Sequence, residues 1–307
     1  MPACPVAVLG EALVDEFHDG AVAGGAPFNV ARSLAGLGAP TVFISRIGAD
    51  DDAGRCVRAS ARRYGLSEAG LQQDARHATG RVSVVEDAGG HRFVIHDDAA
   101  WDHLDLDAAC RTLAPADAGF VYFGSLAQRH ATSRATVRAW VKRCAGIRVL
   151  DLNLRPGADA RLLAAESLML ADWVKLNEEE LAQLADGFAL AAPDDAGRVA
   201  ALMARFSLER LVLTLGARGW RFYGTGGALL ASGPGVAQPQ VVDTVGAGDA
   251  FTAMLLAGLS LGRDLDATLS LANRYAAFIC GVRGPLPPDP VALQPWRAAL
   301  HALPAAA

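Results

Sequence analysis

The sequence predicts an α/β protein in which a mostly parallel β-sheet is covered by helices on both faces. Short apolar runs alternate with longer segments whose apolar residues recur at helical spacing, a pattern typical of β-α-β units. Of the 307 residues, 52% are hydrophobic and 20% are charged, so the chain can bury a large core. The runs expected to form the sheet are residues 6–9, 41–45, 119–123, 148–152 and 210–215.

Two regions depart from this alternation and predict an accessory β layer. In residues 11–20 and 80–96, apolar and polar residues alternate over short stretches, as in a β-strand. The second region contains DAGG, a favourable hairpin turn. No internal repeat, low-complexity tract or linker rich in Pro, Gly and Ser divides the chain. We therefore expect one domain over residues 1–307.

Composition excludes several classes of partner. The formal net charge of −5 gives no long-range attraction to nucleic acid or to an anionic membrane, and no apolar stretch reaches the roughly 18 residues of a membrane span. The five cysteines are widely spaced without a CxxC pair, and the seven histidines show no metal-ligand pattern. With no basic start for a signal peptide, we expect a cytoplasmic protein that binds small metabolites.

The stretch DTVGAGDAF, residues 243–251, predicts an anion site. Gly246, Ala247 and Gly248 let backbone N–H groups approach a ligand closely. The helix-patterned segment that follows adds the positive end of its dipole. Asp249 is unexpected here, because a carboxylate would stand beside a bound phosphate.

Asp249 has two interpretations. It can orient an attacking hydroxyl and accept its proton while the anion site stabilises a phosphoryl group in transit. Alternatively, it only complements the helix dipole in the first turn. The motif alone leaves both interpretations open.

A second glycine turn, GGAPFN at residues 24–29, precedes another helix-patterned segment. Gly24 and Gly25 again allow close approach of a ligand, and Pro27 is favoured at a helix start. Asn29 falls in the first turn, where its amide can donate and accept hydrogen bonds, as a sugar hydroxyl requires. Local capping is the alternative role for Asn29.

The two glycine motifs together resemble the paired signatures of the PfkB family of carbohydrate kinases. They occur in the family's order, and the likeness extends through GEALVD, DLNLRP, VKLNEEEL and LTLGARGW. The resemblance implies a ribokinase-like three-layer α/β/α sandwich with a small β-sheet lid, formed by segments of about 11–23 and 80–100. A homodimer formed through the lid is compatible with this resemblance.

The resemblance also assigns residues to the sugar side of the site. Asp15 would accept hydrogen bonds from sugar hydroxyls, and Arg155 would steady the sugar or the transferred phosphate. The alternatives are a solvated lid residue for Asp15 and a surface salt bridge for Arg155. Phe93 and Trp101 would cover the sugar, or would only pack the lid. The complete expected set for substrate binding is Asp15, Gly24, Gly25, Asn29, Phe93 and Arg155.

The nucleotide side is assigned in the same way. Glu180 would help to hold Mg2+ through water, which suits an ion that keeps much of its water shell. Asp243 and the Val245 carbonyl match a monovalent-cation site of some relatives, but GVRGPLP departs from the usual partner sequence and argues against K+ activation. The residues expected to bind ATP are Asn177, Thr214, Gly216, Gly219 and Asn273.

The resemblance implies an ATP-dependent sugar kinase that transfers the γ-phosphoryl group to a sugar hydroxyl. GEALVD, GGAPFNVA and DLNLRP together favour fructose, converted to fructose 6-phosphate. Ribose, 2-keto-3-deoxygluconate and nucleosides stay open as acceptors. A noncatalytic sugar or nucleotide sensor is the alternative outside this class, although the retained Asp249 argues against it. Walker, HRD, DFG and GxGxxG elements are not found in their expected contexts, which disfavours P-loop kinases, protein kinases and dehydrogenases.

Overall fold

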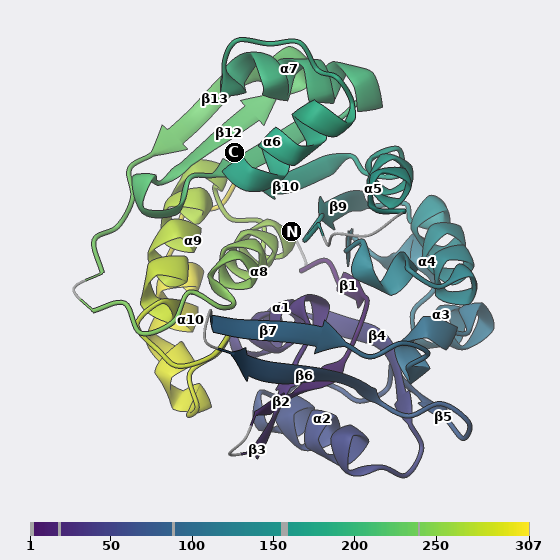
Figure 1. Ribbon diagram of the computed structural model, residues 1–307. Helices are drawn as coiled ribbons and strands as arrows, with labels where there is room; N and C mark the ends of the chain where they lie inside the picture. Colours follow the sequence, from purple (N-terminus) through teal and green to yellow (C-terminus); the bar gives the residue numbers. More distant parts are fainter. Residues whose placement is uncertain (1–2, 18–19, 88–89, 155–158, 239, 307) are drawn as a thin grey trace.

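The protein has a large mixed sheet enclosed between two helical layers (Figure 1). The computed structural model describes residues 3–17, 20–87, 90–154, 159–238 and 240–306. In spatial order, the nine strands of the large sheet are β13 (Ala228–Gly233), β12 (Trp220–Gly224), β11 (Arg210–Thr214), β10 (Trp173–Asn177), β9 (Ile147–Asp151), β8 (Phe120–Phe123), β1 (Val6–Leu9), β4 (Thr41–Gly48) and β5 (Leu71–Asp74).

The order of the strands reverses at β1. The chain leaves β1 for β4 and β5 on one side, then returns to pair β8 with the other side of β1. Pairing is parallel from β5 across to β11 and antiparallel between β11, β12 and β13. Ligands of open α/β sheets bind at such a switch point, beyond the carboxyl ends of the strands.

Alternation along the central strands divides the core into two halves. Val6 and Val8 of β1 belong to one buried cluster, whereas Ala7 and Leu9 belong to the other, as expected for side chains that alternate across a strand. The first cluster is covered by α1 (Ala26–Gly36), α2 (Asp52–Arg63), α8 (Ala247–Ser260), α9 (Leu265–Ile279) and α10 (Gln294–His301). The second is covered by α3 (Leu106–Thr112), α4 (Ala131–Arg143), α5 (Ala160–Leu168), α6 (Glu178–Gly187) and α7 (Asp195–Phe206).

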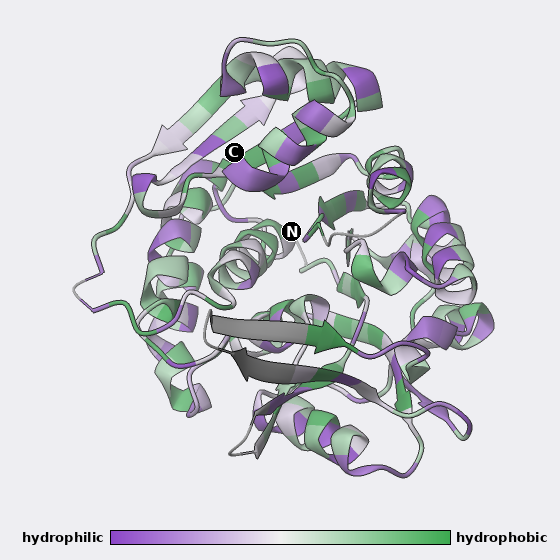
Figure 2. Ribbon diagram, viewed as in Figure 1, coloured by the Kyte–Doolittle hydropathy of each residue, from purple (hydrophilic) through white to green (hydrophobic). Residues whose placement is uncertain are grey.

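The helices differ in how completely they are buried. Helix α8 is apolar on most of its surface in Figure 2 and lies at the centre of the molecule, with Met254 and Leu256 fully buried. Helix α2 instead has alternating charged and apolar residues, as expected for a helix with one side in water. The buried α8 therefore gives the residues at its first turn a rigid support.

A small four-stranded sheet lies across one face of the body (Figure 1). Strand β2 pairs with β3 antiparallel and with β6 parallel, so that Leu13 lies opposite Gly80. The two regions of short β period in the sequence form this sheet. In spatial order, its strands are β3 (Gly20–Gly24), β2 (Leu13–Phe17), β6 (Gly80–Asp87) and β7 (Gly90–Ile95).

The architecture is therefore the three-layer α/β/α sandwich with a small sheet that the resemblance implies. Among the residues described, no helix is both long and apolar enough to span a bilayer.

Candidate active site

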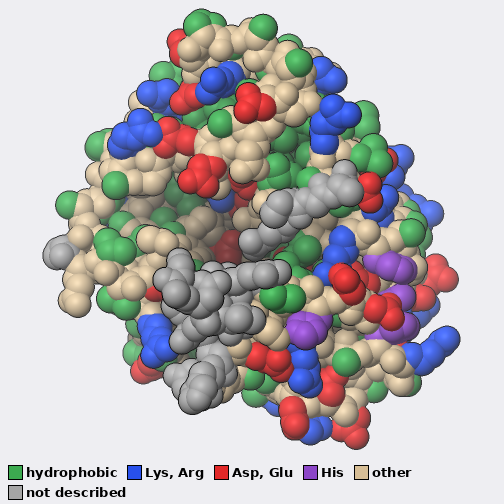
Figure 3. All heavy atoms as spheres, viewed as in Figure 1, with side chains coloured by type: hydrophobic (Ala, Val, Ile, Leu, Met, Phe, Trp, Pro, Cys, Tyr) green, Lys and Arg blue, Asp and Glu red, His purple; other side chains and the backbone are tan. Residues whose placement is uncertain are grey.

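The candidate active site is a cavity of about 790 Å³ at the carboxyl ends of the large sheet's strands. In Figure 3 this face is hollowed near its centre, and acidic side chains are visible within the hollow. Most of the predicted site residues line this cavity, although they come from distant parts of the chain. They are Asp15, Gly25, Asn29, Asn177, Thr214, Gly216, Gly219, Val245, Gly246, Ala247, Gly248, Asp249 and Asn273.

Several predicted residues do not line the cavity or are not described. Gly24, Glu180 and Asp243 are outside its lining. The side chain of Phe93 and the whole of Arg155 lie outside the residues that the structure describes. Trp101 is fully buried beneath the Arg129 guanidinium, 4.0 Å from its ring, and packs against Ile95 and Gly80 of the small sheet, so it does not line the cavity.

The two glycine motifs meet through one buried hydrogen bond. Asn29 Nδ2 donates to Asp249 Oδ2 at 2.8 Å, although the residues are 220 positions apart. The N-cap of α1 is Gly25, and no side chain makes a capping hydrogen bond there. Asn29 therefore does not have the local capping role that was its alternative interpretation. Both side chains are at most 9% exposed. The bond fixes the carboxylate of α8 against the first turns of α1.

Arg32 holds Asn29 from behind and was not identified from the sequence. Its NH2 group donates to Asn29 Oδ1 at 2.5 Å and to the carbonyl of Ala23 at 3.0 Å, while NH1 donates to Ser60 Oγ at 2.7 Å. Burial lowers the pKa of Arg32 to about 10, which leaves the guanidinium charged at neutral pH. Arg32 therefore determines that the Asn29 amide presents its NH2 group to Asp249.

Backbone geometry explains the glycine at the start of α8. Gly246 is the N-cap with φ of 80°, a left-handed conformation that favours glycine. A Cβ at this position would lie 2.5 Å from the Cα of Pro285. The turn therefore needs glycine both for its conformation and for its packing, and it presents the first N–H groups of α8 to the cavity.

A buried lysine lies beside this turn and was also missed. Lys175 Nζ contacts both carboxylate oxygens of Asp151 at 3.2 Å, and Thr252 Oγ1 donates to Asp151 Oδ2 at 2.8 Å. Burial acts to lower the pKa of Lys175, but the carboxylates of Asp151, Glu180 and Asp249 outweigh it and raise the pKa. A Cβ built on Gly248 would lie 2.8 Å from Nζ, so the ammonium adjoins the glycine turn.

The sequence carried a signal for this pair. Lys175 interrupts the apolar strand WVKLN, whose neighbours Val174 and Leu176 face the second core cluster. Alternation turns Lys175 toward α8, on the same face as Asp151 of the adjacent strand. A lysine in a strand that is buried on both faces requires a charged partner.

Glu180 has a local structural role. Its Oε2 accepts from the N–H of Asn177 at 2.9 Å, and Asn177 Oδ1 accepts from the N–H of Glu180, which completes a capping box. Oε1 accepts from the N–H of Leu154 at 3.1 Å. Burial raises the pKa of this carboxyl. Asn177 faces the cavity, whereas both oxygens of Glu180 already accept backbone hydrogen bonds.

The far end of the cavity is formed by loops and by α9. Asn273 of α9 donates to the carbonyl of Pro234 at 2.8 Å, which fixes the loop that also contributes Val236 and Gln238 to the lining. Asp243 accepts from the N–H groups of Val245 at 2.9 Å and Gly284 at 3.1 Å, and so joins two loops behind the glycine turn.

Two buried polar atoms near the carboxyl ends of central strands have no hydrogen-bond partner among the described residues. They are Asn153 Nδ2 and the Tyr122 hydroxyl. Asn153 lines the cavity and has φ of 44°, an uncommon left-handed conformation for a residue other than glycine. Burial raises the pKa of Tyr122 well above its usual value, so its hydroxyl stays protonated. An unsatisfied amide at the cavity wall provides a donor for a polar ligand.

Comparison with known proteins identifies the family. The model of the pfkB family carbohydrate kinases matches residues 7–292. The chain is 36% identical over 293 residues to a fructokinase of Klebsiella pneumoniae, covering 89% of this chain and 91% of the relative.

Two solved structures are also similar. One is an aminoimidazole riboside kinase from Salmonella enterica complexed with aminoimidazole riboside and an ATP analog, with a TM-score of 0.78, 27% identity, and coverage of 95% of this chain and 99% of the other. A fructokinase double mutant from Vibrio cholerae O395, in the fructose, ADP and potassium ion bound form, has a TM-score of 0.77, 26% identity and 98% coverage of both chains. The cavity therefore belongs to a sugar kinase with the ribokinase-like fold, and the chain is a member of the pfkB family of carbohydrate kinases.

Proposed function

We propose that this kinase transfers the γ-phosphoryl group of ATP to a hydroxyl of fructose, giving fructose 6-phosphate, with Asp249 as the general base. The observation that carries the proposal is the contact between Asn29 and Asp249 at the N-terminus of α8. It supports the proposal because the Asn29 amide, the Asp249 carboxylate and the glycine turn line the same cavity.

The proposed reaction uses these groups in turn. Asp249 accepts the proton of the sugar hydroxyl as the hydroxyl oxygen forms a bond to the γ-phosphorus, and the bond from that phosphorus to the β-γ bridging oxygen breaks to release ADP. The N–H groups of the glycine turn stabilise negative charge on the transferred group. The Lys175 ammonium adds a positive charge beside Gly248.

The residues around Asn177 fit magnesium held with ATP through water, but Asn177 suits this role better than Glu180, to which the resemblance assigns it. Both oxygens of Glu180 accept backbone N–H groups, and Glu180 does not line the cavity. When bound with ATP, magnesium would neutralise charge on the phosphates. We assign Asn177 to contact its water shell, because Asn177 lines the cavity and Glu180 does not.

Fructose is the proposed acceptor because of the relatives and because of the polar wall of the cavity. The Klebsiella pneumoniae relative is named a fructokinase, and the Vibrio cholerae structure contains fructose. In this cavity, Asp15, Asn29 and Asn153 offer donors and acceptors to a polyol.

A coupled ADP-release screen tests the acceptor. Fructose, ribose, 2-keto-3-deoxygluconate and nucleosides, including aminoimidazole riboside, are compared at equal concentration with magnesium-ATP. We expect the highest kcat/KM with fructose. A higher value for a riboside would overturn the choice of fructose. Absence of activity with every acceptor in the screen would contradict the kinase assignment itself.

A further inference from the structure

A second cluster of polar side chains lies outside the cavity, at the junction between the small sheet and the body. His77 lies between β5 of the body and β6 of the small sheet, on the segment that enters the small sheet. Asp98 and His103 follow β7, on the segment that returns to the body, and His103 ends the 3-10 helix η1 (Ala100–His103). No motif in the sequence indicates a histidine cluster, because these residues are brought together only by the pairing of β6 with β7.

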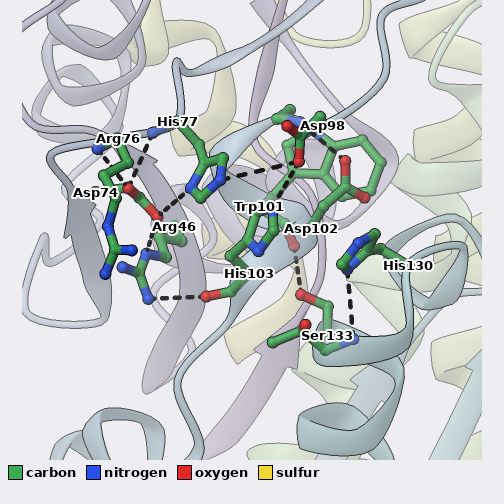
Figure 4. Close-up of polar contacts among 12 residues, drawn as sticks. Arg46, Asp74, Arg76, His77, Asp98, Trp101, Asp102, His103, His130 and Ser133 are labelled. Carbon is green, nitrogen blue, oxygen red and sulfur yellow. Dashed lines mark hydrogen bonds and ion pairs between the residues drawn. The ribbon is translucent and has the colours of Figure 1, made fainter.

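Asp74 fixes the orientation of the His77 ring. Its carboxylate contacts only donors: the N–H groups of Arg76 and His77 at 2.8 and 3.0 Å, the Arg46 guanidinium at 2.8 Å, and His77 Nδ1 at 3.0 Å. Nδ1 therefore carries its proton, and the lone pair is left on Nε2. Figure 4 shows this side of the ring directed toward Asp98. Metal-binding histidines usually donate their other ring N–H to a carboxylate or carbonyl in this way, which fixes the tautomer and the ring orientation.

The other two side chains converge on the same point. Asp98 Oδ1 lies 2.7 Å from His103 Nε2 and 3.9 Å from His77 Nε2. The two imidazole rings are stacked, with centroids 3.7 Å apart. Asp98 has φ of 55°, a conformation uncommon outside glycine, asparagine and aspartate, and this turns its carboxylate back toward the histidines (Figure 4).

We propose that His77, Asp98 and His103 form a binding site for a divalent transition-metal ion, with Zn2+ as the best-matched ion. Two imidazole nitrogens and one carboxylate oxygen are a common ligand set for Zn2+, which leaves a fourth position for water. The donor atoms of the three residues all lie within 4.8 Å of one another. The site is distinct from the kinase cavity, because none of the three residues lines that cavity.

The separations between donors suit an ion of this size. Ligand distances of about 2.1 Å in a tetrahedron require donor atoms about 3.4 Å apart. The observed 2.7 and 3.9 Å bracket that separation, so small rotations of the exposed Asp98 carboxylate and of the His103 ring are sufficient. The side chains of His103 and Asp98 are 20% and 69% exposed, so an ion has access from solvent. Figure 3 shows histidine side chains gathered on the right of this face.

Binding would join the two connections between the body and the small sheet. His77 precedes the small sheet's last two strands and Asp98 follows them, so one ion would link both segments. Because a metal binds the folded arrangement in preference to the unfolded chain, it should raise the melting temperature.

The test is calorimetric titration of nucleotide-free, tag-free protein with Zn2+. We expect one equivalent to bind and to raise the melting temperature. Asp98→Asn and His103→Asn should each weaken binding about 100-fold or more, since loss of a residue that only hydrogen-bonds to a metal ligand already costs about 10- to 100-fold. Asp98→Asn is the more conservative variant, because asparagine also tolerates the left-handed backbone.

His96→Asn is the matched control. This histidine lies on the same returning segment, but its Nε2 is bonded to Ser83 Oγ at 2.7 Å, so wild-type affinity is expected. Co2+ absorption bands that change in His103→Asn and not in His96→Asn would support the assignment independently. No binding up to about 1 mM Zn2+, or equal affinity in the wild type and the Asp98 and His103 variants, would overturn it.

Discussion

Charged residues at the cavity end of the large sheet are buried, whereas those of the small sheet are exposed to solvent. Beneath α8, Asp151 and Lys175 form a pair whose side chains are 0% and 6% exposed. In the small sheet, Glu16 and Arg81 form a pair whose side chains are 35% and 42% exposed. A charge in the first region is almost fully buried and depends on its protein partner, whereas a charge in the second can exchange its partner for solvent.

This difference shows which contacts are fixed. Removing one member of a buried pair leaves an uncompensated charge, which costs far more than losing an exposed pair. The groups around Asp249 are therefore preorganised by neighbours that cannot rearrange cheaply. The small sheet has a solvated surface on which ligand contacts can change at lower cost.

The strongest test of the buried region is Asp249→Asn. Asparagine can still accept the hydrogen bond of Asn29, but it lacks the proton acceptor that the proposed mechanism requires. We expect a loss in turnover of roughly 100- to 10,000-fold, with an unchanged fold and both substrates bound. A coupled assay with fructose and magnesium-ATP, combined with thermal melts and ligand titrations, provides the measurement.

Asp52→Asn is the matched control for the alternative role of Asp249 as a helix-start charge. Asp52 also lies in the first turn of a helix, but its side chain is 91% exposed. Its substitution should leave turnover unchanged. If folded Asp249→Asn also keeps near-normal turnover, Asp249 serves only the helix dipole and the proposed mechanism is wrong.

Lys175→Met tests the buried pair directly. The change leaves Asp151 buried without its cation, so the free energy of unfolding should fall by about 3–5 kcal/mol. Denaturant unfolding measures the loss. Adding Asp151→Leu should restore part of the stability, because the remaining charge is removed.

Lys142→Met, on the exposed side of α4, is the control for removing a lysine. Its effect should stay within about 0.5 kcal/mol. Similar losses in the Lys175 and Lys142 variants would contradict the contrast between buried and exposed charges.

Asn29→Ala should separate sugar binding from nucleotide binding. The truncation removes a polar contact at the sugar end, so fructose binding should weaken by about 1–3 kcal/mol, while ATP binding is largely spared. Asn273→Ala, at the far end of the cavity, should show the opposite preference. Calorimetry with each ligand checks both variants. A reversed pattern would mean that the sugar and nucleotide ends of the cavity have been assigned the wrong way round.

Arg81→Met should have the smallest effect. It breaks the 2.9 Å contact with Glu16 on the exposed face of the small sheet. The free energy of unfolding should change by less than about 1 kcal/mol, as measured by denaturant unfolding beside Lys175→Met. A loss as large as that of Lys175→Met would show that the small sheet is as rigidly determined as the core.

Local sequence patterns predicted the elements that carry the site. Alternating apolar runs predicted the strands, and the two glycine turns with their apolar helices predicted α1 and α8. These features depend on residues that are close in sequence, such as Gly246 at a left-handed N-cap. The same local chemistry explains the acidic first turn of α6.

The sequence by itself determined the fold class and the family, and most of the site residues that it predicts line the cavity, because short motifs specify backbone turns. Only the tertiary structure decided which side chains meet. The bond from Asn29 to Asp249 joins residues 220 positions apart, and the capping box directs Glu180 away from the cavity. Likewise, only the pairing of strands brings Lys175 into contact with Asp151 and His77 close to Asp98. Such contacts depend on register and helix packing across the whole chain, which no local pattern encodes.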